Sequence, residues 1–252
     1  MFWTAVSQAE RTPARSDTDV RVNSSLLPEP NGLPLQVSIF GDPKFKNEVL
    51  RSFEAGYRTQ ITARVSLSGT IFLNDYDDLA SLETGTPYLE SNPSPLHLVI
   101  PNTFANLGHG ETHGLEMFGN WKVSKRWTLS PGYSFLTMHL HHSPLSNDLN
   151  TGPTTQGSSP NHQAQLRSHL DLPSHWGWNA SAYFVGRLSA QAVPSYTRLD
   201  SNFTWQPTER FSIALAGENL LKDRHMEYMG SDLTVLPTMI KRSVYAKFIW
   251  QF

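Results

Sequence analysis

The chain has 252 residues, a formal net charge of -2 and no cysteine. The lack of cysteine excludes disulfide bonds and thiolate metal sites, and the near-neutral charge excludes the basic surface that nucleic-acid binding requires. Charged residues make up only 17% of the chain and aromatic residues 11%, with 17 prolines and 16 glycines. This mixture is typical of short strands joined by turns. No apolar run approaches the roughly 18 residues of a membrane-spanning helix, but a spanning β-strand needs only about ten.

We predict ten β-strands and no helix of useful length. The alternation is clearest at the end of the chain, where Val244, Ala246, Phe248, Trp250 and Phe252 point one way and polar residues point the other, with Ile249 as the one exception. Such a period of two predicts a strand with one apolar and one polar face. The predicted strands cover residues 2–9, 49–60, 63–78, 110–122, 126–140, 162–172, 177–188, 196–206, 210–221 and 241–252.

The connections between these strands alternate strictly in length. Tight connections are predicted near residues 60–62, 123–125, 173–176 and 207–209, and long ones near 10–48, 79–109, 141–161 and 222–240, with a shorter one at 189–195. Outer-membrane barrels segregate their connections in this way, with tight periplasmic turns and long extracellular loops. The sequence therefore predicts an all-β, antiparallel transmembrane β-barrel. The stretches 23–34 and 150–160 are predicted to be flexible outer loops, where ligand capture would take place.

The seven tryptophans give an independent check on this topology. All of them, including Trp3, are predicted to gather at the tight-turn end of the strands. Amphipathic rings collect where hydrocarbon meets headgroup, so we expect a periplasmic aromatic girdle that faces lipid. The girdle residues are Trp121, Trp127, Trp176, Trp178, Trp205 and Trp250.

The polar face of the predicted sheet is too charged for the interior of a small soluble barrel. Buried charges are costly unless they are paired or hydrated, whereas a wide lumen filled with water or a polar plug removes that cost. The charged residues predicted to point inward are Glu54, Arg58, Glu116, Lys122, Arg167, Asp171, Arg187, Arg198, Asp200, Glu218 and Lys247.

Several stretches resemble the C-terminal part of TonB-dependent outer-membrane receptors. The most specific is GENLLKDRHMEY (217–228), followed by RSVYAKFIWQF (242–252). Others are FWTAVSQAERTPARSD (2–17), FKNEVLRSFEAGYRTQ (45–60), LSGTIFLNDYDDLASLE (67–83), NTFANLGHGETHGLEMFGNW (102–121) and WTLSPGYSFL (127–136). The resemblance extends over nearly the whole chain.

The resemblance implies a bacterial outer-membrane receptor that imports a scarce ligand, most often a ferric siderophore. Family members hold an N-terminal plug inside a barrel of about 22 strands and take energy from an inner-membrane complex. Residues 1–252 would form the C-terminal part of such a barrel, without the plug, the energy-coupling motif, the remaining strands or an export signal. The implied partners are outer-membrane lipid and the barrel-assembly machinery, which would read Phe248, Trp250 and Phe252 as its signal. No cofactor and no catalytic residue are expected.

A few histidines are candidates for ligand binding. His139, His141 and His142 end a predicted strand beside a long outer loop, and His109 lies near the same rim. His139 and His141 are two residues apart, so their rings share a face and are suited to a metal or an iron-bearing ligand. The alternative is that these are ordinary surface histidines that bind no ligand. Asp75, Asp77 and Asp78 are interpreted as a hydrated strand end, because no glycine turn and closing glutamate follow as in a calcium loop.

The alternative is a self-contained small outer-membrane barrel. A passive pore would need a complete closed ring of strands. An omptin-like protease also has ten strands and would use acidic and histidine residues at its outer rim, here Asp77, Asp78, His141 and His142. A fold alone does not decide among these functions.

Overall fold

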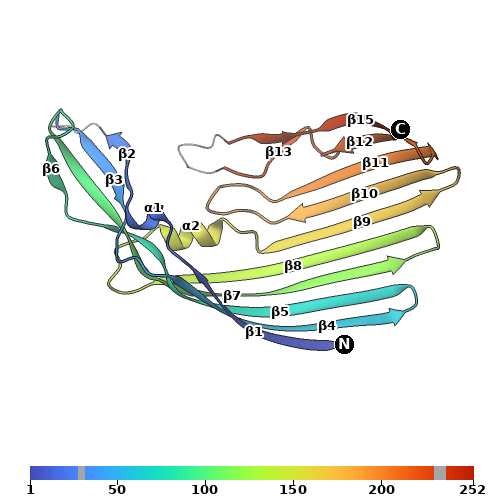
Figure 1. Ribbon diagram of the computed structural model, residues 1–252, viewed down its shortest axis with the longest axis horizontal. Helices are drawn as coiled ribbons and strands as arrows, with labels where there is room; N and C mark the ends of the chain where they lie inside the picture. Colours follow the sequence, from blue (N-terminus) through green and yellow to red (C-terminus); the bar gives the residue numbers. More distant parts are fainter. Residues whose placement is uncertain (28–31, 230–236) are drawn as a thin grey trace.

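The computed structural model contains all ten predicted strands in one antiparallel sheet (Figure 1). It describes residues 1–27, 32–229 and 237–252. The strands neighbour one another in chain order, with hydrogen bonding from each to the next. They are β1 (Phe2–Arg11), β4 (Glu48–Thr62), β5 (Val65–Thr84), β7 (His97–Lys122), β8 (Trp127–His142), β9 (His162–Leu172), β10 (Trp176–Val185), β11 (Tyr196–Thr208), β12 (Phe211–Glu218) and β15 (Ser243–Trp250).

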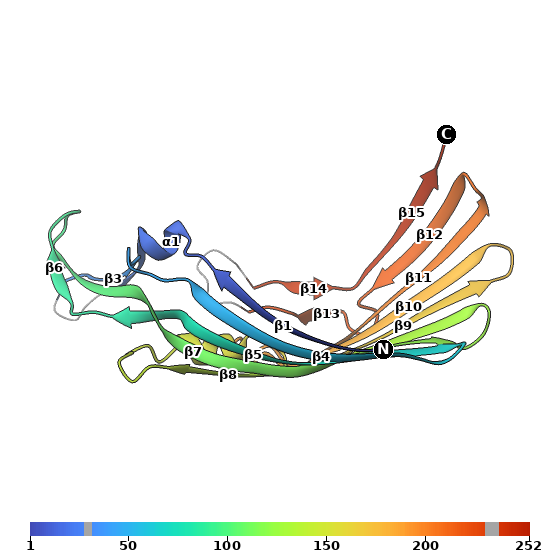
Figure 2. The same cartoon turned by 60° about the horizontal axis from the view of Figure 1, so that its bottom comes forward.

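The sheet is curved but not closed. Its first strand, β1, pairs only with β4, and its last strand, β15, pairs only with β12 within the described residues. Figure 2 shows β15 rising away from β1, so that the two edges stand apart. The prediction of an open, partial barrel is confirmed, and each edge strand presents a row of unpaired backbone groups.

The segregation of tight and long connections is also confirmed. The tight ones, at residues 63–64, 123–126, 173–175 and 209–210, lie together at one end of the sheet (Figure 1). At the other end of the sheet, the prediction of a long connection at residues 79–109 was wrong in large part. β5 and β7 continue to pair past their predicted ends, as far as Thr84 opposite Asn102, so that β7 is 26 residues long.

Short elements occupy the long connections. These are α1 (Arg15–Thr18), β2 (Arg21–Leu27), β3 (Leu35–Phe40), β6 (Tyr88–Glu90), α2 (Thr151–Gly157), β13 (Arg224–Met226) and β14 (Met239–Lys241). The stretches predicted to be flexible therefore carry regular structure, β2 at residues 23–27 and α2 within 150–160, because both pack against neighbouring strands. Residues 28–31 of the first stretch and 230–236 of the last long connection lie outside the described part. No described helix is long and apolar enough to cross a membrane.

The two faces of the sheet differ sharply in chemistry. Directly paired residues of antiparallel strands point to the same face, so the register assigns every strand residue to a face. One face, which we call the apolar face, exposes large hydrophobic side chains such as Phe53 (50% exposed), Ile71 (58%) and Met117 (42%). Few hydrophobic side chains are buried in the described residues, which is expected where the apolar face meets lipid and not a protein core.

The opposite face, which we call the polar face, carries the predicted inward charges. Glu54 lies opposite Phe72, Arg167 opposite Ser181, and Lys247 opposite Ala214, all on the side away from the exposed hydrophobic residues. Arg187 is the exception, because β10 ends at Val185 and the residue lies beyond it. The charge pattern therefore follows the pleat of the strands.

Candidate functional site

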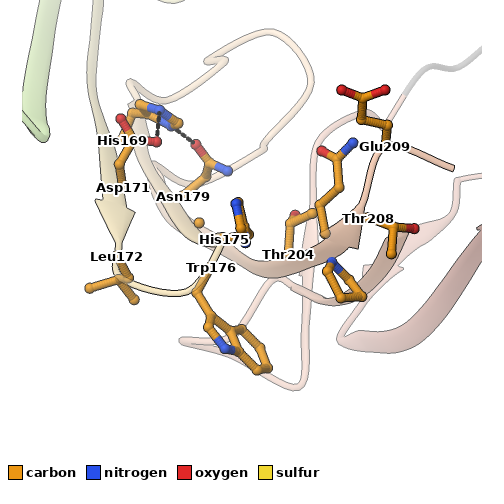
Figure 3. Close-up of a pocket in the computed structure, with 12 residues that line it drawn as sticks. His169, Asp171, Leu172, His175, Trp176, Asn179, Thr204, Thr208 and Glu209 are labelled. Atoms are coloured by element: carbon orange, nitrogen blue, oxygen red, sulfur yellow. Dashed lines mark hydrogen bonds and ion pairs between the residues drawn. The ribbon is translucent and has the colours of Figure 1, made fainter. Parts of the chain in front are cut away.

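The polar face has a cavity at its tight-turn end, between β9, β10 and β11 (Figure 3). Its volume is about 700 Å³. His169 Nδ1 lies 2.7 Å from Asn179 Oδ1, and His169 Nε2 lies 3.2 Å from Asp171 Oδ1. Asn179 Nδ2 in turn donates to Asn202 Oδ1 at 3.0 Å. Figure 3 shows Trp176 pointing away from this polar row. The row itself gives the cavity a hydrogen-bonding wall suited to water or to polar protein surface.

A second cavity, of about 250 Å³, lies at the long-loop end beneath α2. Glu48 is held at its border, because its carboxylate accepts hydrogen bonds from Arg11 Nε at 2.6 Å and from the Ala80 backbone N–H at 2.8 Å. His142 also lines it, with Nε2 4.0 Å from Asp148 Oδ2. This arrangement brings His142 and one fixed carboxylate to a small pocket close to the outer loops, which His109 and His141 also line.

The loop that carries α2 is fixed by a buried carboxylate. Asp148 accepts hydrogen bonds from the backbone N–H groups of Leu82, Asn150 and Thr151 at 2.8, 2.9 and 3.0 Å. Burial by itself would raise the pKa of Asp148, but the hydrogen bonds from Thr151, Leu82 and Asn150 outweigh it and lower the pKa to about 2. The carboxylate is therefore charged at neutral pH and ties this loop to β5.

The element GENLLKDRHMEY forms a buried polar network. Asn219 is fully buried and has a positive φ of 53°, a conformation that asparagine tolerates better than most residues. Its backbone N–H donates to Asp200 at 2.9 Å, its side-chain amide donates to the Ile240 carbonyl at 3.1 Å, and its amide oxygen lies 3.0 Å from His225 Nδ1. No role for Asn219 was predicted from the sequence. The only signal was a polar residue near the end of the predicted strand 210–221, within the most family-specific stretch.

The predicted histidine candidates divide between the two faces. His109 lies directly opposite His141, and Glu111 directly opposite His139, on the apolar face. His142 lies on the polar face, where it borders the cavity under α2. His139 and His141 thus share a face, as the alternation indicates; His109 and His141 also line the cavity under α2, whereas His139 borders neither cavity. Ligand binding by these residues stays a prediction.

The acidic candidates are engaged in ion pairs. Arg51 Nη1 lies 2.6 Å from Asp77 and 3.4 Å from Asp75, and Lys46 Nζ lies 3.3 Å from Asp78. No group of three or more metal-binding side chains converges in the described residues. The four residues considered for a protease do not assemble either, because His141 and His142 face opposite sides and both aspartates are paired.

The six predicted girdle tryptophans share the apolar face next to the tight turns. Trp121 lies opposite Leu129 and Trp176 opposite Trp205, while Trp178 stacks on Phe203 with ring centroids 5.9 Å apart. Trp3 differs, because it pairs with Gly56 on the polar face and its ring covers the space that a Cβ of Gly56 would need. The interpretation of all seven as one girdle was therefore wrong for Trp3.

The C-terminal strand is exposed along its whole length. Phe248 and Trp250 lie on the apolar face, opposite Ile213 and Phe211. The rings of Trp250 and Phe211 meet edge to face with centroids 5.5 Å apart, and the side chain of Phe252 beyond the strand is fully exposed. A role of these residues in assembly stays a prediction.

An open antiparallel sheet with an exposed apolar face, a charged polar face and segregated loop lengths defines part of a transmembrane β-barrel. The chain matches the TonB dependent receptor-like β-barrel family over residues 1–220, and it belongs to that family. Receptors of this family are transporters and not enzymes. No curated protein matches the sequence.

The structures most useful for comparison are siderophore receptors. A mutant of the ferric enterobactin receptor from Pseudomonas aeruginosa is 14% identical with a TM-score of 0.70, and the match covers 100% of this chain and 38% of that one. The siderophore receptor PirA from Acinetobacter baumannii is 15% identical with a TM-score of 0.70, covering 100% and 39%. The ferric yersiniabactin uptake receptor FyuA from Yersinia pestis is 17% identical with a TM-score of 0.62, covering 100% and 35%. These identities establish a shared fold alone, and the chain spans well under half of each receptor.

Proposed function

We propose that this chain forms the C-terminal part of an outer-membrane receptor barrel that takes up a ferric siderophore by energy-coupled transport. The observation that carries the proposal is the combination of family membership with a match that runs along the whole chain but along only 38% of the ferric enterobactin receptor. A chain that superposes on one part of such a receptor supports the same role within a larger barrel.

The two open edges of the sheet support the pairing of further strands with β1 and β15. In hydrocarbon each unpaired backbone N–H or C=O group costs several kcal/mol, so β1 and β15 need neighbours in a membrane. We propose that the remaining barrel strands and a plug lie in additional polypeptide. The polar row around His169 and Asn179, at the tight-turn end of the polar face, is suited to contact such a plug. Lipid would cover the apolar face.

The small-barrel alternative requires β1 and β15 to close on each other. The sheet has ten strands along its main path but leaves these two edges apart, which favours the larger receptor over a passive pore or a protease. The protease version also lacks a convergent set of catalytic side chains among the candidates described above.

Growth on defined iron sources tests the proposal. A strain that carries the full-length gene and no other siderophore receptor is compared with the same strain after in-frame deletion of the segment encoding residues 1–252. In iron-chelated medium with one ferric siderophore at a time, we expect growth and uptake of radioactive iron only with the intact gene. Dissipation of the proton gradient should abolish uptake.

Two results would contradict the proposal. Equal uptake of every ferric siderophore by the intact and deleted strains would show that residues 1–252 are not needed for siderophore transport. Uptake that persists without the proton gradient would indicate a passive pore. A fractionation blot shows whether the deleted protein still reaches the membrane, with Lys125→Gln in a tight turn as the matched folded control.

A further inference from the structure

Two neighbouring strands carry an alternating set of metal-binding side chains on the apolar face. β7 contributes His109, Glu111 and His113, and β8 contributes His139 and His141. We call these five residues the histidine ladder. Because successive residues of a strand point to opposite faces, the spacing of two places all five on one face.

The ladder lies past the apolar residues of that face. His113 is eight residues along β7 from Trp121, and Leu115 and Met117 occupy the apolar face between them. A spanning strand needs about 9–11 residues to cross the hydrocarbon. The ladder therefore begins at the membrane boundary opposite the tryptophans, where side chains reach water and lipid headgroups.

The imidazole rings are already close enough to share an ion. The ring centroids of His109 and His141 are 5.8 Å apart, and those of His113 and His139 are 6.0 Å apart. A bound imidazole places its ring centre about 3.2 Å from a zinc-class ion, because the metal–nitrogen bond is about 2.0–2.1 Å. Two imidazoles on one ion then have centres about 4.5–6.4 Å apart, depending on the angle between them. Both pairs fall within this range.

The side chains are also free to turn toward an ion. His109, Glu111, His139 and His141 are exposed, and His113 is half-buried. No hydrogen bond or ion pair to these five side chains occurs among the described residues. Glu111 lies directly between His139 on β8 and Asp75 on β5, and Asp75 is already paired with Arg51 at 3.4 Å. Glu111 is thus an unpaired carboxylate with His139 beside it on β8 and with His109 and His113 two residues away on its own strand.

We propose that the histidine ladder binds a divalent transition-metal ion of the zinc, copper or nickel class. His113, His139 and Glu111 form the primary site, and His109 with His141 extends it as a two-imidazole site. Imidazole nitrogen with carboxylate oxygen is a ligand set that these ions accept. In the side-chain positions of the structure two imidazoles meet at a time, and Glu111 reaches the ion by rotation about its own side-chain bonds. The bound ion joins β7 to β8 at the outer boundary, independently of the transported ligand.

Titration calorimetry and copper electron paramagnetic resonance test this site on the full-length protein in detergent micelles. We expect Zn²⁺ binding by the wild-type protein and a Cu²⁺ spectrum with splitting from imidazole nitrogen. His139→Gln should weaken binding at least about tenfold, since even the loss of a residue that only supports a metal ligand costs that much. Glu111→Gln should weaken Zn²⁺ binding in the same direction while the nitrogen splitting remains.

His142→Gln is the matched control, because His142 neighbours the ladder in sequence but faces the other way. Its Zn²⁺ affinity should equal that of the wild-type protein. The double variant His109→Gln, His113→Gln removes ligands from the other strand and should abolish binding, with the heat-dependent gel shift of a folded barrel checked for every variant. Absence of binding by the wild-type protein, or equal loss in His142→Gln and His139→Gln, would overturn the proposal. Zn²⁺ binding that is unaffected by Glu111→Gln would show that the Glu111 carboxylate is not a ligand of the ion.

Discussion

The indole rings of Trp176 and Trp205 stack across β10 and β11, with centroids 5.6 Å apart and planes inclined by 18°. Both lie next to tight turns on the apolar face, and together with Trp121, Trp127 and Trp250 they form a row along one end of the sheet. Stacked indoles at this level present a broad amphipathic surface, as expected at a headgroup boundary.

Lipid-dependent quenching tests whether this row is a membrane girdle. In bilayers with bromine at different depths, we expect headgroup-proximal bromine to quench tryptophan emission more strongly than bromine at the bilayer centre. The double variant Trp176→Phe, Trp205→Phe should reduce the quenchable emission. Trp3→Phe is the control and should not, because that ring lies over Gly56 on the polar face. Stronger quenching from the bilayer centre would reject the girdle.

Deletion of Phe252 tests its role in barrel assembly. The residue is fully exposed beyond β15, so its loss removes no contact from the folded sheet. We nevertheless expect the outer-membrane level of the full-length receptor to fall strongly, since a terminal aromatic resembles the signal that assembly reads. The control is deletion of Thr86, an exposed residue between β5 and β6. Equal levels of both variants in a fractionation blot would rule out the assembly role.

Asp148 should make the outer loop sensitive to acid. Its pKa in the folded chain is about 2, below its ordinary value of 3.8. A depressed pKa means that the stabilising effect is complete above about pH 4 and is lost as the pH falls through about 2. We expect hydrogen exchange at the amides of Leu82, Asn150 and Thr151, corrected for intrinsic rates, to accelerate over that range.

The variant Asp148→Ala should produce the same opening at neutral pH. A hydrogen bond to a charged group contributes about 1.5–3 kcal/mol, so exchange at these three amides should rise by at least about tenfold. Glu209→Gln, in the tight turn at the other end of the sheet, should leave their exchange unchanged. Unchanged exchange in Asp148→Ala would mean that this carboxylate does not hold the loop.

Asn219 should be the most sensitive position of the last long connection. Asn219→Ala leaves the Ile240 carbonyl and His225 without their partner and places alanine at a positive φ, for a combined cost of roughly 2–4 kcal/mol in the free energy of unfolding. Asn219→Gly removes the same hydrogen bonds but tolerates the backbone conformation, so it should cost less. Urea titration of the refolded protein measures both, and equal costs would show that the backbone conformation contributes nothing.

The strands and their faces follow from local alternation, which is why residues 162–172 were predicted with their observed bounds. The first half of β7 was missed because proline and glycine interrupt its sequence, for example at Pro101 and Gly108. Parallel pairing with β3 and antiparallel pairing with β5 and β6 override those local signals. The first half of β7 is a strand because of pairing with segments that are distant in the sequence, and no local sequence pattern indicates that pairing.

The candidate sites show the same limit. The shared face of His139 and His141 follows from their spacing, and the structure adds that β7 places His109 and Glu111 opposite them. The Asn219 network was not predictable, since it joins Asn219 to residues of three different strands, and those of β11 and β14 are 19 and 21 residues away along the chain. Burial of one asparagine against three partners has no counterpart in local composition.

The length of β7 determines how far the proposed receptor stands above the cell surface. From His113 at the membrane boundary to His97 at its start, β7 continues for about 50 Å along the strand. It is joined there by β3 and β6, with β2 outermost, and β6 is anchored where Arg21 pairs with Glu90. A bacteriophage, an antibody or a colicin-sized protein that approaches the cell would therefore meet this stiff projection before it met the membrane.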